Sequence, residues 1–353
     1  MVSEMTSAER VLTALHGRVP DRVPTFEWLI DRQVMQALHP GCDLFDFVER
    51  AGLDGVVVYD DYRKEWLTKS TYVDEWGITL AVMTEEYPTS IDFPLKDPEQ
   101  LADLTWPDPC AEWRFGSLRA AVQRFKGKKA ILFRLRDAYS LPRYLRGMEN
   151  MMMDLVLNPD LVRALVELSV NYYTHMAHRA IELGADVLWT SDDYCDNKGP
   201  VMGPKRWREF FLPGLRRLIE NVKDADCLFI KHCDGNINPI IADLVDTGID
   251  CIDPIDAEAG MNLAEVKAKY GHRVAIKGGL PVGSVLSQGA PEQVVAAVKQ
   301  CLLDAGIDGG YILSSSSDIT ASVRPENYQA MLEALREYGR YPLDVDRLSS
   351  PGE

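Results

Sequence analysis

Short apolar runs recur along the chain, and most are followed by a stretch in which apolar residues have helical spacing. Apolar runs of about four to eight residues bounded by turn residues are typical of strands buried on both faces. The pattern predicts eight strands, at residues 23–28, 54–59, 130–135, 186–190, 227–231, 250–253, 273–277 and 310–313.

Helical periodicity predicts the principal helices at residues 118–125, 142–183, 204–222 and 325–338. An additional helix is expected near the N-terminus, with Thr6 or Ser7 as its N-cap and Val11 and Leu15 on one face. A strand-like insertion at 71–79 follows the second strand. The stretch 88–113 is rich in proline and acidic residues, and we expect it to be irregular.

Strands that alternate with helices favour an α/β fold with a parallel sheet covered by helices. Eight such units predict a closed (β/α)₈ TIM barrel with an N-terminal helical extension and an insertion after strand two. A doubly wound open sheet is the alternative. No low-complexity linker or short repeat divides the chain, so residues 1–353 are expected to form a single domain.

The charge of the chain narrows the choice of partners. Its formal net charge is −16, from 54 acidic and 38 basic residues. Nucleic acid and anionic membranes attract basic surfaces, so neither is expected to be the main partner. Seven scattered cysteines without a CxxC pair do not form a disulfide framework, and no apolar run approaches the roughly 18 residues of a membrane span. We expect a soluble cytoplasmic protein.

Polar and ionisable residues follow nearly every predicted strand. In (β/α)₈ barrels the catalytic groups come from these C-terminal strand ends. Loops are polar in any protein and Asp often caps helices, but so many strand ends together favour a functional site. The residues concerned are Glu27, Asp60, Asp61, Arg134, Arg136, Asp192, Asp193, Tyr194, His232, Cys233, Asp234, Asp253, Asp256, Lys277 and Ser314 to Asp318.

The segment from His232 to Asp234 has three consecutive side chains that can ligate a metal or transfer a proton. Imidazole, thiolate and carboxylate are the three zinc ligand types, so metal binding is one interpretation and a hydrogen-bonded structural histidine is the other. Because neighbouring residues on a strand point to opposite faces, His232 and Asp234 can share a direction that Cys233 does not.

The remaining candidates are open to more than one interpretation. Asp192 with Asp193, and Asp60 with Asp61, fit an acid–base pair, a carboxylate metal site or helix caps. Lys277 precedes Gly278 and Gly279 and fits an anion contact. No P-loop, dinucleotide-binding fingerprint, zincin motif or nucleophile elbow is present.

Several ordered motifs resemble one family. From about Ala8 to Leu335 the chain resembles the uroporphyrinogen decarboxylase superfamily, including its cobalamin-dependent methyltransferase branch. The motifs are Gly17 to Pro24, Gly184 to Asp186, Asp192 to Tyr194, Gly199 with Pro200, Pro204, Lys231 to Asn236, Gly278 to Leu280, Gly289 to Val294, and Pro325 to Asn327. The resemblance implies a (β/α)₈ barrel, in agreement with the strand count.

The two branches imply different sites. The decarboxylase's early arginine motif is replaced here by Glu27 to Arg32, its late histidine falls near Ser316 or Ser317, and Asp61 matches its central aspartate. The methyltransferase branch uses a zinc held by an HxC pair and a late cysteine. Here His232 matches the histidine, Asp234 takes the HxC cysteine position with Cys233 one place early, and Ser317 takes the late cysteine position. A harder site of His232 and Asp234 would suit oxygen substrates.

The leading hypothesis is therefore a corrinoid-linked methyltransferase that moves a methyl group between a small O- or N-methyl compound and a cobalamin carrier. Zinc or another divalent metal is the expected cofactor, held by His232 and Asp234 with Cys233 as the alternative ligand. A corrinoid protein is an expected partner, and a homodimer is compatible with the fold. The alternatives are porphyrinogen decarboxylation, with Asp61 stabilising a protonated pyrrole, and a non-catalytic binding protein.

Residue roles follow from this hypothesis. We expect Asp61, Asp192, Asp193, His232 and Asp234 to act in catalysis. The residues expected to bind substrate are Glu27, Trp28, Arg134, Arg136, Tyr194, Asn236, Lys277 and Ser317.

Overall fold

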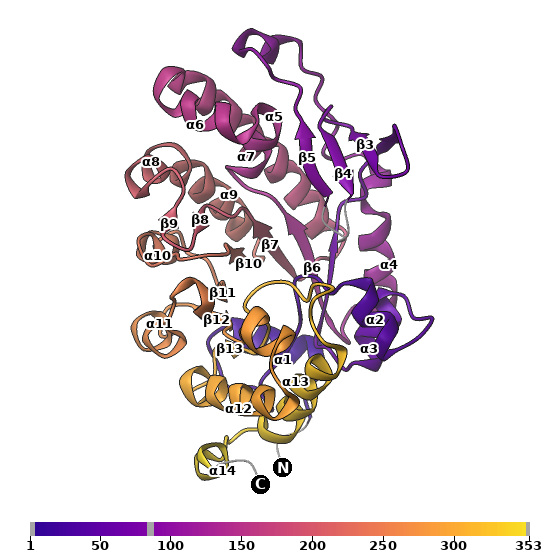
Figure 1. Ribbon diagram of the computed structural model, residues 1–353, viewed down its shortest axis with the longest axis vertical. Coiled ribbons are helices and arrows are strands. Elements are labelled where there is room, and N and C mark those ends of the chain that lie inside the picture. The colour runs from indigo at the N-terminus through magenta and orange to yellow at the C-terminus, as the bar shows by residue number, and fades with distance from the viewer. Residues whose placement is uncertain (1–3, 83–87, 351–353) are drawn as a thin grey trace.

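A computed structural model of the protein describes residues 4–82 and 88–350. Seven parallel strands form one curled sheet at its centre, and helices surround this sheet (Figure 1). The strands, in their spatial order, are β1 (Gly55–Tyr59), β6 (Ala130–Leu135), β7 (Val187–Ser191), β10 (Leu228–His232), β11 (Cys251–Ile255), β12 (Ala275–Gly278) and β13 (Tyr311–Ile312). Their order in space follows their order in the chain without the reversal that a doubly wound sheet has.

Seven of the eight predicted strands therefore lie in this sheet, with ends shifted by one or a few residues. The remaining one, the first predicted strand at 23–28, forms only an isolated parallel bridge between Thr25 and Leu313. The carbonyl of Thr25 also accepts a hydrogen bond from the amide of Asp54 (2.8 Å). The segment thus contacts both edges of the sheet, but Pro24 has no amide hydrogen to continue a ladder. A closed barrel of eight strands stays a prediction.

The predicted insertion after strand two is a separate antiparallel sheet. Its order is β2-β3-β4-β5, and it stands beside α5 and α7 in Figure 1. These strands are β2 (Lys64–Trp66), β3 (Thr71–Asp74), β4 (Thr79–Val82) and β5 (Pro88–Asp92). The expectation of an irregular stretch from Pro88 is wrong at β5. That strand is largely exposed, so its pairing with β4 defines it rather than an apolar pattern. A short hairpin, β8 (Cys195–Asp196) and β9 (Gly199–Pro200), follows β7.

Helices lie between the strands of the large sheet along the chain, and others precede its first strand and follow its last. They are α1 (Ser7–Leu15), α2 (Arg32–Leu38), α3 (Leu44–Arg50), α4 (Gly116–Phe125), α5 (Ser140–Arg146), α6 (Met148–Leu157), α7 (Pro159–Glu182), α8 (Pro204–Phe210), α9 (Leu212–Asp224), α10 (Ile241–Val245), α11 (Leu263–Tyr270), α12 (Pro291–Cys301), α13 (Pro325–Tyr338) and α14 (Val345–Ser349). The single helical region predicted at 142–183 is divided at Gly147, which has φ 79°, and again before Pro159. No helix in the described ranges is both long enough and apolar enough to cross a bilayer.

The N-terminal helix α1 begins at a capping box. The side chain of Thr6 accepts from the amide of Glu9 (3.2 Å), and the carboxylate of Glu9 accepts from the amide of Thr6 (2.8 Å). Thr6 is therefore the N-cap, one of the two residues that the sequence proposed. Val11 and Leu15 on the inner face of the helix are buried.

Apolar side chains form two layers, one on each side of the curled sheet. The inner cluster contains residues from α1 and from successive strands, including Leu132, Trp189 and Ile230. The outer cluster lies between the strands and the helices and includes Phe133 and Phe229. Alternate residues of each strand thus face the interior and the helices, which is the period of two expected for strands.

Candidate active site

Strand alternation decides which strand-end side chains meet. On β10, Leu228 and Ile230 belong to the inner cluster, so His232 also points inward, whereas Phe229 and Cys233 belong to the outer cluster. The same rule turns alternate residues of neighbouring strands inward. The residues on the inner side include Arg134, Arg136, Asp253 and Lys277, and those on the helix side include Asp137, Asp192 and Lys231.

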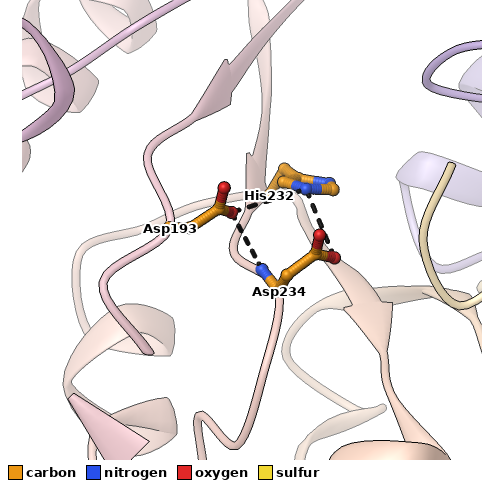
Figure 2. Close-up of side chains that lie close together, drawn as sticks. All are labelled: Asp193, His232 and Asp234. Atoms are coloured by element: carbon orange, nitrogen blue, oxygen red, sulfur yellow. Dashed lines mark hydrogen bonds and ion pairs between the residues drawn. The ribbon is translucent and has the colours of Figure 1, made fainter. Parts of the chain in front are cut away.

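Asp193, His232 and Asp234 form a compact group at the C-terminal ends of β7 and β10 (Figure 2). We call it the aspartate–histidine cluster. His232 Nε2 lies 3.5 Å from Asp234 Oδ1 and 3.7 Å from Asp193 Oδ1. The amide of Asp234 donates to Asp193 Oδ1 (3.1 Å). One ligand atom from each residue falls within 4.8 Å of the others, so the three side chains can share one cation.

A hydrogen bond to Asp253 fixes the other ring nitrogen of His232. Nδ1 donates to Asp253 Oδ2 (2.6 Å), and Asp253 Oδ1 accepts from Lys277 Nζ (2.8 Å). The imidazole is buried and stacks on Trp28, with ring centroids 4.7 Å apart. A carboxylate on Nδ1 leaves Nε2 directed at the aspartates, as in histidines that bind metals.

Electrostatics at the cluster reflect its excess of carboxylates. Burial alone would lower the pKa of His232, but Asp234 and Asp253 raise it well above its ordinary value. Loss of solvent and the neighbouring Asp234 raise the pKa of Asp193. Burial would raise the pKa of Asp253, but Lys277 and His232 outweigh it and hold that pKa below its ordinary value. Without a cation, the cluster therefore favours a protonated imidazole beside its carboxylates.

Asp234 has one oxygen held and one oxygen available. The hydroxyl of Ser317 donates to Oδ2 (3.1 Å). Oδ1 is buried, lies 3.5 Å from His232 Nε2, and has no hydrogen-bond partner in the described part of the chain. A buried carboxylate oxygen without a donor is costly unless a cation or a substrate proton meets it. One imidazole nitrogen and two carboxylates are a donor set that divalent metals accept.

The structure does not place the Cys233 thiol with this donor set. Cys233 is buried among the helix-facing residues, and its sulfur accepts from the amide of Tyr194 (3.3 Å). Its side chain faces away from His232 because the two residues are adjacent on an extended backbone. Asp193, for which the sequence left an acid–base pair, a carboxylate metal site and a helix cap open, takes the third position of the group.

A second ionic group supports the cluster from the helix side of the sheet. Lys231 Nζ lies 2.9 Å from Asp137 Oδ2 and donates to the carbonyls of Asp192 (3.0 Å) and His232 (2.6 Å). Lys231 thereby ties the ends of β7 and β10 together. The hydroxyl of Tyr194 donates to Asp137, and this tyrosine is buried on the helix side of the sheet. Burial and the nearby Asp192 raise the pKa of Asp137 to about 7.

Several of the expected site residues are engaged elsewhere. Asp192 is buried and accepts from the amides of Tyr139 (2.6 Å) and Ser140 (2.8 Å) at the start of α5, the helix-cap role among its open interpretations. Asp61 accepts from the amide and hydroxyl of Ser117 (3.0 and 2.6 Å) in the first turn of α4.

Glu27 and Asn236 also make local contacts. Glu27 is buried and accepts from the hydroxyl of Ser315 (2.7 Å), and burial raises its pKa to about 7. Asn236 accepts from the amide of Asn238 (3.1 Å) and so shapes the turn after His232.

A pocket of about 260 Å³ lies at the ends of β1, β6 and β7, and its lining residue Ser191 is paired in register with His232 of the cluster. The antiparallel sheet β2–β5 forms one wall, and the ends of β1, β6 and β7 with α5 and α7 form the others. Arg134 and Arg136 line it, and so does Asp60 in place of the expected Asp61. The guanidinium of Arg134 lies over the rings of Trp28 and Tyr59 at 4.5 Å, so Trp28 contacts both the pocket and His232.

Sequence reasoning assigned no role to Asp253, Lys231 or Asp137. Asp253 appeared among the strand-end residues, but its partner His232 is 21 residues away and only the register of β10 with β11 joins them. For Lys231, which directly follows the apolar run 227–230, a signal was available, whereas Asp137 follows Arg136 and carried none. A lysine paired within a strand of the sheet is buried with that strand, and a buried charge requires an opposite charge nearby.

Comparisons with known proteins agree on one family. The family described as Uroporphyrinogen decarboxylase (URO-D) matches residues 45–338. Among solved structures, a methyltransferase from Methanosarcina mazei superposes with a TM-score of 0.77 at 20% identity, covering 95% of this chain and 99% of that chain.

Curated relatives bear two kinds of name. A methylated-thiol–coenzyme M methyltransferase of Methanosarcina mazei is 25% identical over 96% of this chain and 91% of its own length. A methylcobamide:CoM methyltransferase of the same organism is 24% identical over 64% of each chain. The uroporphyrinogen decarboxylase of Mannheimia succiniciproducens is 22% identical over 83% of this chain and 81% of its own length.

Proposed function

The chain belongs to the uroporphyrinogen decarboxylase (URO-D) family, and from that premise we propose that it moves a methyl group from a small O- or N-methyl compound to a corrinoid carrier. Relatives named for methyl transfer support the reaction class, and the name methylcobamide supports the carrier. The observation that carries the proposal is the aspartate–histidine cluster at the strand ends, with His232 oriented by Asp253.

The reaction requires help at the departing atom. The methyl carbon exchanges its bond to oxygen or nitrogen for a bond to the cobalt of the reduced corrinoid. The departing atom keeps the electron pair and takes up a proton. His232 Nε2 and the cluster carboxylates lie where a group can neutralise that developing charge, and such preorganised groups stabilise transition states strongly.

The donor set fits a divalent metal held by Asp193, His232 and Asp234. Such an ion would polarise the departing oxygen or nitrogen as a Lewis acid. Ser317 orients Asp234, while Asp253 and Lys277 orient His232. With oxygen donors where the resemblance implies thiolates, this set is harder and favours oxygen over thiol substrates.

The test combines metal analysis with corrin spectroscopy. Purified protein mixed with reduced cobalamin and a panel of methyl ethers and methylamines should convert the cobalt(I) spectrum to that of methylcobalamin. His232→Ala and Asp234→Asn should each lose this activity and the bound metal together. An unchanged corrin spectrum across the panel would count against the proposal.

Uroporphyrinogen decarboxylation remains the alternative, supported by relatives with that name. It predicts formation of coproporphyrinogen from uroporphyrinogen, with loss of activity in Asp61→Asn. A pocket of about 260 Å³ is smaller than the roughly 300–1,000 Å³ of sites for drug-sized ligands. A tetrapyrrole with eight carboxylates exceeds that size, so the pocket favours the smaller substrates of the methyl-transfer proposal.

A further inference from the structure

Two arginines of the pocket form no ion pair with any residue that the structure describes. Arg134 and Arg136 are half-buried and line the same cavity. Within residues 4–82 and 88–350, neither guanidinium has a hydrogen bond or an ion pair, although each lies over aromatic rings. Buried or half-buried arginines are normally paired, because a desolvated charge without a partner is unfavourable.

The acidic residues of the same pocket are already engaged. Arg114 donates to both oxygens of Glu75 (2.5 and 2.6 Å) and to Asp60 (3.3 Å). Asp74 accepts from the amides of Trp76 and Ile78, both at 2.9 Å. Asp60 and Asp74 lie near enough to Arg136 to interact with it electrostatically, but neither forms an ion pair with Arg134 or Arg136. The donor groups of both guanidinium ions are therefore available to a ligand. Planar guanidinium groups suit a carboxylate, which they can bind through two parallel hydrogen bonds.

Aromatic and aliphatic side chains, in equal numbers, form most of the remaining wall. Seven of the 21 lining residues are Tyr or Trp, whereas aromatic residues make up 9% of the chain. Tyr144 and Tyr173 come from the helix side, and Tyr72 and Trp76 from the antiparallel insertion. Tyr172 adds a buried hydroxyl that lacks a hydrogen-bond partner among the described residues. Such walls favour a flat apolar body by stacking and edge contacts.

We propose that this pocket binds a small aromatic carboxylate, with its carboxylate on Arg134 and Arg136 and its ring between the tyrosines and the insertion. The assignment rests on the proposed function, since it makes this acid the body of the methyl donor. Trp28 contacts Arg134 and stacks on His232, and the lining residue Ser191 is paired in register with His232. A methyl group on the ring would therefore face the aspartate–histidine cluster.

Calorimetry with benzoate, benzamide and cyclohexanecarboxylate tests the pocket without any methyl transfer. Benzoate should bind with saturation, while the neutral amide and the non-aromatic acid should each bind about tenfold or more weakly. Arg136→Ala should weaken benzoate by about tenfold or more, and Arg136→Lys should restore only part of the loss because its ammonium lacks the planar fork. Arg163→Ala, which removes an exposed charge on α7, is the matched control and should bind as wild type.

The outcomes separate this proposal from the proposed function. Benzoate binding that depends on Arg136, without methyl transfer from 4-methoxybenzoate, would uphold the pocket and overturn the reaction. Methyl transfer from a neutral aliphatic donor at an unchanged rate in Arg134→Ala and Arg136→Ala would uphold the reaction and overturn the pocket. Equal binding of benzoate and benzamide, in variants folded by circular dichroism, would also overturn it.

Discussion

His232 is restrained at both ring nitrogens and on one face of its ring. Asp253 fixes Nδ1, Trp28 covers one face of the ring, and the aspartates stand at Nε2. The restraint determines what the imidazole can do, because only Nε2 is directed at the position of a substrate or a metal. Asp253 is therefore a positioning residue whose effect is exerted through His232.

We expect Asp253→Asn to lower methyl transfer by about 10- to 100-fold, the usual cost of losing the outer partner of a ligating histidine. The variant should also lower metal affinity, because the amide no longer favours the tautomer with Nδ1 protonated. It leaves Lys277 without its carboxylate, so the melting temperature should fall as well.

Rates for Asp253→Asn are measured at a temperature at which circular dichroism shows the variant folded. Asp246→Asn, a change to an exposed aspartate paired with Arg273, is the control. Unchanged metal affinity in Asp253→Asn would contradict the positioning role.

Glu27 makes stability depend on pH. Its pKa of about 7 lies above the ordinary value of 4.5, so the folded protein retains a proton that the unfolded chain releases between those values. Stability is therefore lost as the pH rises from about 4.5 to 7, by up to about 3 kcal/mol. Glu27→Gln stays neutral, and relative to wild type it should melt higher at pH 8 than at pH 5. A difference in melting temperature that is the same at both pH values would exclude this role; Glu333→Gln, on the exposed face of α13, is the control.

For single residues, the sequence predicted the directions of side chains better than their contact partners. The period of two along a strand correctly separated His232 and Asp234 from Cys233, because the backbone is still extended there. It could not show that Asp61 would meet Ser117 or that Asp193 would complete the cluster, since those contacts depend on how loops leave the strands. Ser317 lies beside Asp234, as expected from the position of the late cysteine.

One buried ionic group connects the antiparallel insertion to the large sheet, in addition to the apolar contacts of Trp76 and Ile78. Arg114, in the short helix Glu112–Phe115, binds Glu75 of the insertion and Asp60 at the end of β1. This connection matters because the insertion supplies one wall of the pocket.

Arg114→Met should destabilise the protein by about 3–5 kcal/mol, since it leaves two carboxylates without their partner. Hydrogen exchange should show faster exchange in β3 and β4 than in β6 and β7. Adding Glu75→Gln to Arg114→Met should recover part of the stability, because one uncompensated charge is removed. Uniform loss of protection in both sheets would argue against a separate connection.

Elements buried on both faces were the predictable ones. The strands from β1 to β13 in the large sheet appeared as apolar runs, whereas β5 is exposed and carries no such pattern. The helical region 142–183 looked continuous because apolar residues persist through it. Gly147 and Pro159 divide it for backbone reasons that hydrophobic spacing does not report.

At the scale of the whole molecule, a metal that binds only the folded state adds to its stability. At a free concentration 100 times its dissociation constant it contributes about 2.7 kcal/mol. We expect zinc or manganese to raise the melting temperature of wild type and a chelator to reverse the shift. His232→Ala should abolish the shift. Cys233→Ala should retain it even if its own stability is lower, because its thiol faces the helices. Loss of the shift in Cys233→Ala alone would contradict the donor set.

Trp28 has a further consequence as an optical reporter. Its indole stacks on the imidazole of His232 and lies under the guanidinium of Arg134, so one fluorophore touches both the cluster and the pocket. Protonated imidazole quenches indole emission, and a cation or a ligand that replaces the proton or occupies the pocket should change that quenching. The difference between wild type and Trp28→Phe isolates this signal from the other six tryptophans. Emission can then report binding at the aspartate–histidine cluster and in the pocket in real time.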